Sequence, residues 1–221
     1  FGDRIERFCT FDSSLSSIVD RAVGSKRFRV RVRTRGGHSY DDFGNDNAIA
    51  GLASLVGKLY GIRVPEGGKT TYNVGMISGG TSVNTIAQEA EMLYEFRSDR
   101  RENLEYMERQ FMEVFDRAKA EGMDVSFKVI GVRPCEGQVD PKRKQALSDW
   151  AHRVVEEMTG QAPKHCAGST DCNIPLSLGI PSVCVGSFRG AGAHTREEYV
   201  ETDSLEEGYK VAFGMIFGSR D

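Results

Sequence analysis

The sequence predicts an α/β protein in which a ferredoxin-like βαββαβ module interrupts an α/β layer formed by the two ends of the chain. Two observations support this prediction. Alternating and helical apolar patterns follow one another in the order β-α-β-β-α-β between about residues 25 and 134. After them, helices alternate with a short apolar segment, which is typical of part of an α/β layer. Residues 1–24 are expected to join this layer.

The first module strand has the clearest pattern. Residues 27–35 alternate without a break, so Phe28, Val30 and Val32 should face a core. The other module elements are expected as a helix over 46–60, strands over 70–78 and 89–98, a helix over 101–120 and a strand over 124–132.

The alternation leaves a row of arginines on the outer face of the first strand. In a ferredoxin-like sheet this strand lies beside the third, which should bring Arg29, Arg31 and Arg33 near Glu91 and Glu95. Opposite charges paired across strands contribute roughly 0.2–1 kcal/mol each. A phosphate-binding strip is the alternative, although the neighbouring acids would neutralise it.

The C-terminal part is predicted to contain three helices and one buried strand. Helices are expected over about 141–159, shortly after Asp171 and from near Ser204, and the strand over 181–186. Ser204 and Glu207 have the spacing of a capping box. The last helix is expected to bury Leu205, Tyr209, Ala212 and Ile216.

Composition excludes several classes of protein. The 221 residues are 39% hydrophobic and 28% charged with a net charge of −3, which argues against a dedicated binder of nucleic acid or anionic membranes. No apolar run approaches the ~20 residues of a membrane helix. Five cysteines without a C-x-x-C pair favour thiols in a reducing compartment, so a cytoplasmic location is expected. Since the chain begins at Phe1, we expect a processed, trimmed or truncated product.

Several polar residues stand where functional sites are usually built, at strand ends and in glycine-rich loops. His194 lies in a Gly/Ala-rich loop that could present a metal ligand, and Asp171 either joins it or caps a helix. His38 follows Gly36-Gly37 and could donate a hydrogen bond to a developing oxyanion, or it is an ordinary surface histidine.

Four further candidates have simpler alternatives. Asn84 could bind a ligand or only form a turn. Arg97 and Arg133 could each fork onto a substrate carboxylate, or they make ordinary salt bridges. Asp12 would be unremarkable as a helix cap or loop residue.

Taken together, these motifs resemble a known family. The matching stretches are Gly36-Gly37-His38-Ser39, 72–84, Glu95-Phe96-Arg97-Ser98, Gly168-Ser169-Thr170-Asp171 and 193–200. In that order they resemble the dinuclear-zinc exopeptidases and amidohydrolases that include carboxypeptidase G, peptidase T, dipeptidase V, aminoacylase and succinyl-diaminopimelate desuccinylase. The resemblance implies a partial zinc-exopeptidase catalytic α/β domain over residues 1–24 and 135–221, interrupted by a lid and dimerisation domain over 25–134.

The resemblance also implies roles for individual residues. Asp12 and His194 match metal ligands of a site with two zinc ions, and His38 matches a lid histidine that completes the oxyanion site of the partner subunit. The positions that match substrate-binding residues are Asn84, Arg97, Arg133, Gly168, Ser169 and Thr170.

The family's first catalytic half has no counterpart in this sequence. Its H-x-D motif, bridging Asp and Glu-Glu pair would lie before Phe1, so this chain alone is expected to bind zinc weakly and hydrolyse nothing. For the intact enzyme the resemblance implies metal-dependent hydrolysis of di- or tripeptides that carry a free carboxylate, by a homodimer. The alternatives are an N-acyl amino acid amidohydrolase and a non-catalytic dimerisation or binding module. Neither nucleic acid nor membrane is an expected partner.

Overall fold

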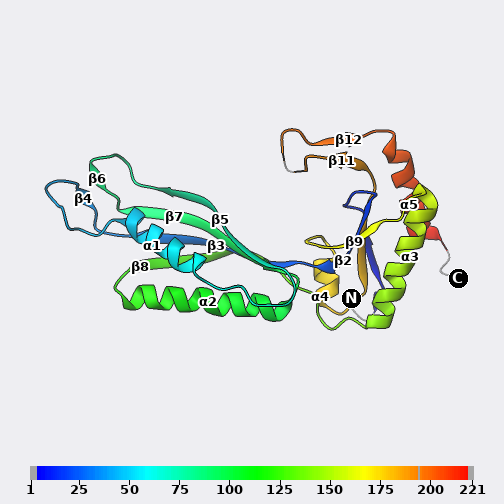
Figure 1. The fold of residues 1–221 in the computed structure, drawn as a ribbon, viewed down its shortest axis with the longest axis horizontal. Coiled ribbons are helices and arrows are strands. Elements are labelled where there is room, and N and C mark those ends of the chain that lie inside the picture. The colour runs from blue at the N-terminus through cyan, green and yellow to red at the C-terminus, as the bar shows by residue number, and fades with distance from the viewer. Residues whose placement is uncertain (1–3, 194, 219–221) are drawn as a thin grey trace. The chain divides into compact units, whose positions relative to one another are not determined.

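The computed structural model describes residues 4–193 and 195–218. The chain forms two compact units (Figure 1). One consists of Phe1–Val23 and Arg133–Asp221, and the other of Gly24–Val132. The first unit is thus built from both ends of the chain and is called the two-ended unit below. The second unit lies between these ends in the sequence and is called the inserted unit.

The inserted unit has the predicted ferredoxin-like order of elements. Its sheet has the strand order β5-β7-β3-β8, so the first module strand lies beside the third, as expected. The strands are β3 (Gly24–Arg33), β5 (Thr70–Gly79), β7 (Glu89–Ser98) and β8 (Asp124–Arg133), and the helices are α1 (Ala48–Tyr60) and α2 (Arg101–Ala120).

An aromatic cluster holds these helices against the sheet. The Phe111 ring on α2 lies 4.1 Å from the Phe28 ring on β3, 4.4 Å from the Phe115 ring and 5.7 Å from the Tyr94 ring, measured between ring centroids. All four side chains are buried. Large buried rings carry much of the hydrophobic stabilisation of a core, so this cluster anchors the unit.

The arginine row forms an ion-pair ladder on the other face of the sheet. Arg29 pairs with Glu91 at 3.3 Å, and Arg31 pairs with Glu91 at 2.9 Å and with Glu89 at 3.3 Å. Arg33 pairs with Glu89 at 3.0 Å. The predicted pairing with Glu91 is confirmed for Arg29 and Arg31, whereas Arg33 pairs with Glu89 and Glu95 pairs with Arg27 instead. These acids neutralise the arginine row, which argues against a phosphate-binding strip.

The two-ended unit contains a four-stranded sheet in the order β1-β10-β2-β9. Its strands are β1 (Phe8–Thr10), β2 (Ser17–Ala22), β9 (Lys164–Gly168) and β10 (Ser182–Val185). Strands β1 and β10 are parallel to each other, β10 is antiparallel to β2, and β2 is parallel to β9. The remaining elements are α3 (Pro141–Thr159), α4 (Asn173–Ser177), β11 (Arg189–Ala191), β12 (Tyr199–Glu201) and α5 (Ser204–Phe217).

The last helix buries a different face from the one predicted. Leu205, Tyr209 and Ile216 are 49%, 69% and 58% exposed, while Val211 and Met215 point into the core. Gly208 explains the choice, because a Cβ at this position would lie 1.8 Å from the carbonyl oxygen of Ser187. Only the face of α5 that contains Gly208 can approach the backbone at Ser187 so closely.

The predicted capping box at the start of α5 is also wrong. The N-cap residue is Asp203 rather than Ser204. The Ser204 hydroxyl donates to the carbonyl oxygen of Glu201 at 2.5 Å and accepts from the backbone N–H of Arg189 at 2.8 Å. Glu207 accepts a hydrogen bond from the Arg189 guanidinium at 2.6 Å, so tertiary contacts take both side chains of the expected box.

In the described part of the chain, no helix combines the length and apolar character that crossing a membrane requires.

Candidate functional site

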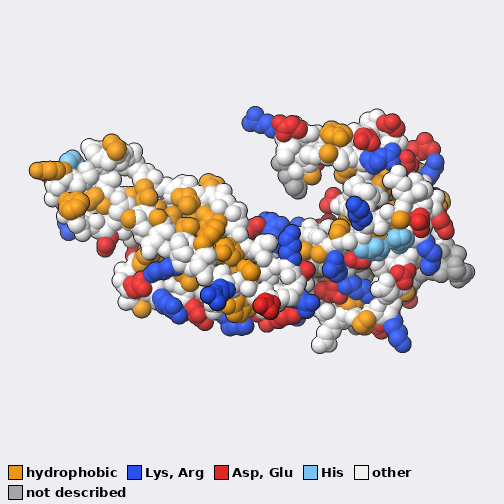
Figure 2. Space-filling model, in the orientation of Figure 1, with side chains coloured by type: hydrophobic (Ala, Val, Ile, Leu, Met, Phe, Trp, Pro, Cys, Tyr) orange, Lys and Arg blue, Asp and Glu red, His pale blue; other side chains and the backbone are white. Residues whose placement is uncertain are grey.

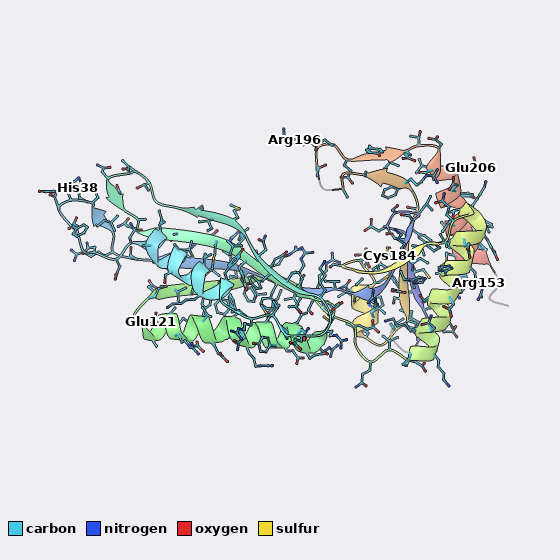
Figure 3. All side chains as sticks on the ribbon, in the orientation of Figure 1. His38, Glu121, Arg153, Cys184, Arg196 and Glu206 are labelled. Carbon is cyan, nitrogen blue, oxygen red and sulfur yellow. The ribbon has the colours of Figure 1, made fainter. Side chains whose placement is uncertain are left out.

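A short β-ladder at one end of the inserted unit brings together two predicted site residues, His38 and Asn84. Strand β4 (Gly37–His38) pairs with β6 (Thr85–Ile86), which places His38 opposite Thr85. The backbone N–H of Ser39 donates to the carbonyl oxygen of Asn84 at 3.0 Å. Figure 3 shows His38 at this end of the inserted unit.

The turn that carries His38 depends on the two glycines before it. Gly36 and Gly37 have φ angles of 68° and 145°. A Cβ at Gly36 would lie 2.3 Å from the Gln88 side chain, and one at Gly37 would lie 2.6 Å from the Cβ of Asp42. Asp42 in turn accepts the His38 backbone N–H at 2.7 Å. The backbone of this turn therefore requires Gly36 and Gly37, whereas His38 contributes its backbone N–H to it.

The polar groups around His38 and Asn84 leave donors available. The His38 side chain is 50% exposed, and its Nδ1 lies 3.3 Å from the Asp41 carboxylate and 3.4 Å from the backbone nitrogen of Tyr40. These contacts occupy Nδ1 and leave Nε2 to donate. The Ser82 hydroxyl donates to the Asn84 Oδ1 atom, which leaves the amide NH₂ of Asn84 as a donor. The two turns that carry His38 and Asn84, called the tip below, can thus offer two hydrogen-bond donors to an anionic oxygen.

The structure does not bring Arg97 to this tip. In the sheet register Arg97 lies opposite Ser25 near the end of β7, whereas Glu89 begins this strand opposite Arg33. Its guanidinium forks onto Glu95, with Nε 2.8 Å from Oε1 and the second nitrogen 3.2 Å from Oε2. Partial burial acts to raise the pKa of Glu95, but hydrogen bonds from Arg97 and Arg27 outweigh it and hold that pKa below its usual value.

Arg133 does meet the predicted substrate loop. Its guanidinium donates to the carbonyl oxygen of Thr170 at 3.1 Å and lies 3.9 Å from the Asp171 carboxylate. Gly168, at the start of this loop, ends β9 and accepts the backbone N–H of Val23 at 2.8 Å. Arg133, Gly168 and Thr170 thus belong to one local arrangement, which also includes Ser169 by sequence.

Sequence reasoning missed the residue that organises this loop. Asn173 is 1% exposed, and its Oδ1 accepts the backbone N–H of Thr170 at 2.9 Å. Its amide NH₂ donates to the carbonyl oxygens of Val23 and Pro134, both at 2.9 Å. A buried amide with all these partners ties three segments together. Nothing in the sequence distinguishes this asparagine from one that simply starts a helix.

The structure describes only one of the two predicted metal ligands, Asp12. Asp12 is exposed and follows β1, whose last residue Thr10 pairs with Cys184. Because β1 and β9 run in opposite directions, Asp12 and Gly168 lie towards opposite ends of the sheet. His194 lies outside the described residues.

The donors in the described part of the chain do not fit a dinuclear zinc centre. Over residues 4–193 and 195–218, no group of three or more His, Cys, Asp or Glu side chains could hold a metal ion. Near Asp12, burial raises the pKa of the Cys184 thiol to about 11.

Comparison with known proteins identifies the inserted unit. Residues 22–123 match the M20 peptidase dimerisation domain. A protein from Haemophilus influenzae, described as a homolog of one p-aminobenzoyl-glutamate hydrolase subunit, is 35% identical over 119 residues, which cover 53% of this chain and 26% of that protein.

Solved structures match the fold of nearly the whole chain. Aminopeptidase PepT from Bacillus cereus is similar with a TM-score of 0.72 and 23% identity, over 98% of this chain and 58% of PepT. A tripeptidase from Staphylococcus aureus is similar with a TM-score of 0.71 and 20% identity, over 96% of this chain and 56% of the tripeptidase. The chain therefore spans little more than half the length of these structures.

The matches define the class of protein from which the inserted unit comes. Residues 22–123 form a dimerisation domain of the M20 peptidase family. The family resemblance predicted from the sequence is thereby confirmed, as is the mixed α/β fold.

Proposed function

We propose that this chain is part of a hydrolase that cleaves peptide or amide bonds in small peptides, with di- and tripeptides as the first substrate class. The observation that carries the proposal is the M20 dimerisation domain set within a fold that follows PepT over 98% of the chain. Residues 25–134 serve as lid and dimerisation domain, and residues 1–24 and 135–221 belong to the catalytic domain. N-acyl amino acids are the alternative substrates.

Within this proposal the tip acts on the reacting carbonyl. His38 Nε2 donates to the oxyanion in the site of the partner subunit, and Asn84, one hydrogen-bonded turn away, offers its amide to the substrate. A donor aimed at developing negative charge typically lowers the barrier by ~2.7–4 kcal/mol. The His, Cys, Asp and Glu side chains of the described residues do not form a zinc site.

The substrate carboxylate is assigned to the arginines. Arg133 already contacts the loop that contains Gly168, Ser169 and Thr170, which supports a role at the edge of the pocket. Arg97 would have to exchange Glu95 for the substrate carboxylate, because both groups bind its guanidinium in the same forked geometry.

The inserted unit also offers an apolar surface for a second copy of the chain. Strand β5 stands at an edge of the sheet, and Met76 and Ile77 on it are 55% and 57% exposed. Ile49 and Tyr60 on α1 are also large and exposed. Figure 2 shows apolar side chains gathered on one face of this unit. An exposed edge strand beside such side chains favours pairing with another chain.

Sedimentation equilibrium tests the dimer. The chain should sediment as a dimer, and Ile77→Lys should shift it towards monomer, because a charge on this surface opposes its burial. Ile130→Lys is the matched control, since Ile130 lies on the other edge strand and is 43% exposed. A monomeric parent chain, or equal effects of the two variants, would contradict this surface.

Peptide hydrolysis by the full-length protein that contains this chain tests the activity. Di- and tripeptides with free C-termini should be cleaved faster than their C-terminal amides. The family resemblance implies a metal-dependent hydrolase, so a chelator should also abolish cleavage. A dimer that cleaves neither peptides nor N-acyl amino acids would favour the non-catalytic module instead.

A further inference from the structure

A chain of hydrogen-bonded side chains crosses the surface of the two-ended unit and includes none of the candidate site residues. His165 Nδ1 lies 2.7 Å from the Asp20 carboxylate, and its Nε2 lies 2.9 Å from His152 Nδ1. The Ser148 hydroxyl donates to the same Asp20 oxygen at 2.8 Å. These residues come from β2, α3 and β9, and Figure 2 shows histidine side chains at the surface of this unit.

The two imidazoles lie edge to edge rather than face to face. Their planes differ by only 5°, and their centroids are 5.2 Å apart. This separation equals the 2.9 Å between the facing nitrogens plus about one ring radius on each side. The line between the nitrogens therefore runs through both rings, as in a linear N–H···N hydrogen bond. With this alignment the two facing nitrogens do not converge on a shared ion.

The hydrogen bonds determine which nitrogen carries each proton when both histidines are neutral. The Asp20 carboxylate can only accept, so His165 donates from Nδ1 and keeps a lone pair on Nε2. That lone pair accepts the Nδ1 proton of His152. A lone pair therefore remains on His152 Nε2, and the Glu156 carboxylate, one helical turn further along α3, lies 3.8 Å from it.

We propose that His152 Nε2 and the Glu156 carboxylate bind a divalent transition-metal ion such as Cu²⁺, Ni²⁺ or Zn²⁺. Imidazole and carboxylate donors four residues apart on one helix face suit these ions. Ligand bonds of ~2.0–2.2 Å place neighbouring donor atoms about 3 Å apart, so Glu156 needs to move by less than 1 Å. Its side chain is 54% exposed and free to do so.

His165 and Asp20 position the proposed ligand. A metal-binding histidine usually donates its second ring N–H to an acceptor that fixes its tautomer and orientation. Here that acceptor is His165, which Asp20 orients in turn, and the Asp20 side chain is only 14% exposed. With two protein ligands the ion keeps open positions for water, so binding is weak and exchangeable. The proposed site differs from the predicted zinc site, whose ligands are Asp12 and His194.

Copper binding to the whole chain tests the site. Calorimetry and electron paramagnetic resonance should show a site with one coordinated nitrogen that His152→Gln removes and Glu156→Gln weakens at least about tenfold. Glu157→Gln is the matched control, because it removes the same charge from an adjacent exposed position of α3 and should leave the affinity unchanged.

Two results would overturn the proposal. One is copper affinity that His152→Gln leaves unchanged, and the other is a spectrum in which both imidazoles coordinate the ion. His165→Gln tests the positioning role and should weaken binding about tenfold while the one-nitrogen spectrum persists. Unchanged affinity in a folded His165→Gln variant, checked by circular dichroism, would refute that role.

Discussion

Ser39 donates its backbone N–H to the carbonyl oxygen of Asn84 at 3.0 Å, and this bond joins the two turns that carry His38 and Asn84. Beside it, His38 pairs with Thr85 across a two-residue ladder. The pair is thus held by backbone bonds, so the side chains can change without loss of the tip. Function and fold can therefore be separated by substitution at this position.

His38→Ala should reduce kcat of the full-length enzyme by about 10²–10³ while the melting temperature stays nearly constant. The reason is that the side chain is half exposed, whereas the backbone of the turn makes the structural hydrogen bonds. Steady-state kinetics and thermal unfolding measure the two effects. Turnover like that of the parent enzyme would refute the oxyanion role.

Phe111→Ala should destabilise the inserted unit by about 3–5 kcal/mol, since a buried ring leaves a cavity that its neighbours cannot fill. Phe111 is fully buried among Phe28, Tyr94 and Phe115. Met112→Ala, the next residue on α2 and 37% exposed, is the control and should cost less than about 1 kcal/mol. Urea unfolding compares the two. Equal costs would show that the aromatic cluster does not anchor the unit.

Gly208→Ala should destabilise the protein by about 1–3 kcal/mol, because the added methyl group meets the Ser187 backbone and forces α5 away. Gly57→Ala is the matched change in α1. A Cβ there meets nothing within 4 Å, so it should stabilise the protein by about 0.4–1 kcal/mol through reduced chain entropy. Thermal unfolding should move in opposite directions for the two variants. A shift of the same sign in both would refute the close approach at Gly208.

Glu95 should make stability depend on pH in the acid range. Its pKa in the folded protein lies below the usual value of 4.5, so the ionised carboxylate stabilises the fold above that value. The contribution is lost as the pH falls through the lower folded-state pKa. Urea unfolding at pH 6 and pH 3 should therefore show a smaller difference for Glu95→Gln than for the parent protein. Glu105→Gln, which removes the same charge from an exposed position on α2, is the control variant.

The inserted unit could be predicted well because its signals are local and repeated. The alternation over β3 and β7 specifies both the buried face and, with the ferredoxin-like order, the partners of Arg29 and Arg31. The strands of the two-ended unit were harder to predict. Strands β1, β11 and β12 have three residues each, too few to show a period.

The sequence named candidate site residues one by one, but it did not predict how they are arranged. The motifs drew attention to His38, Asn84 and Arg133, yet they contained no information on what each side chain contacts. Arg97 forks onto Glu95 because the two face the same side of one strand, and Asn173 organises the substrate loop through contacts with distant segments. Such partners depend on which segments meet in space.

By itself the sequence determined the order of elements, the buried face of the inserted sheet and the family to which residues 22–123 belong. Only the tertiary structure decided which side of α5 is buried, because that helix is apolar on two sides. Periodicity favours whichever side has the larger residues, but the close approach of Ser187 to Gly208 admits only the side with the smaller ones. The linear pairing of His152 with His165 likewise arises from a helix and a strand that meet only in the folded chain.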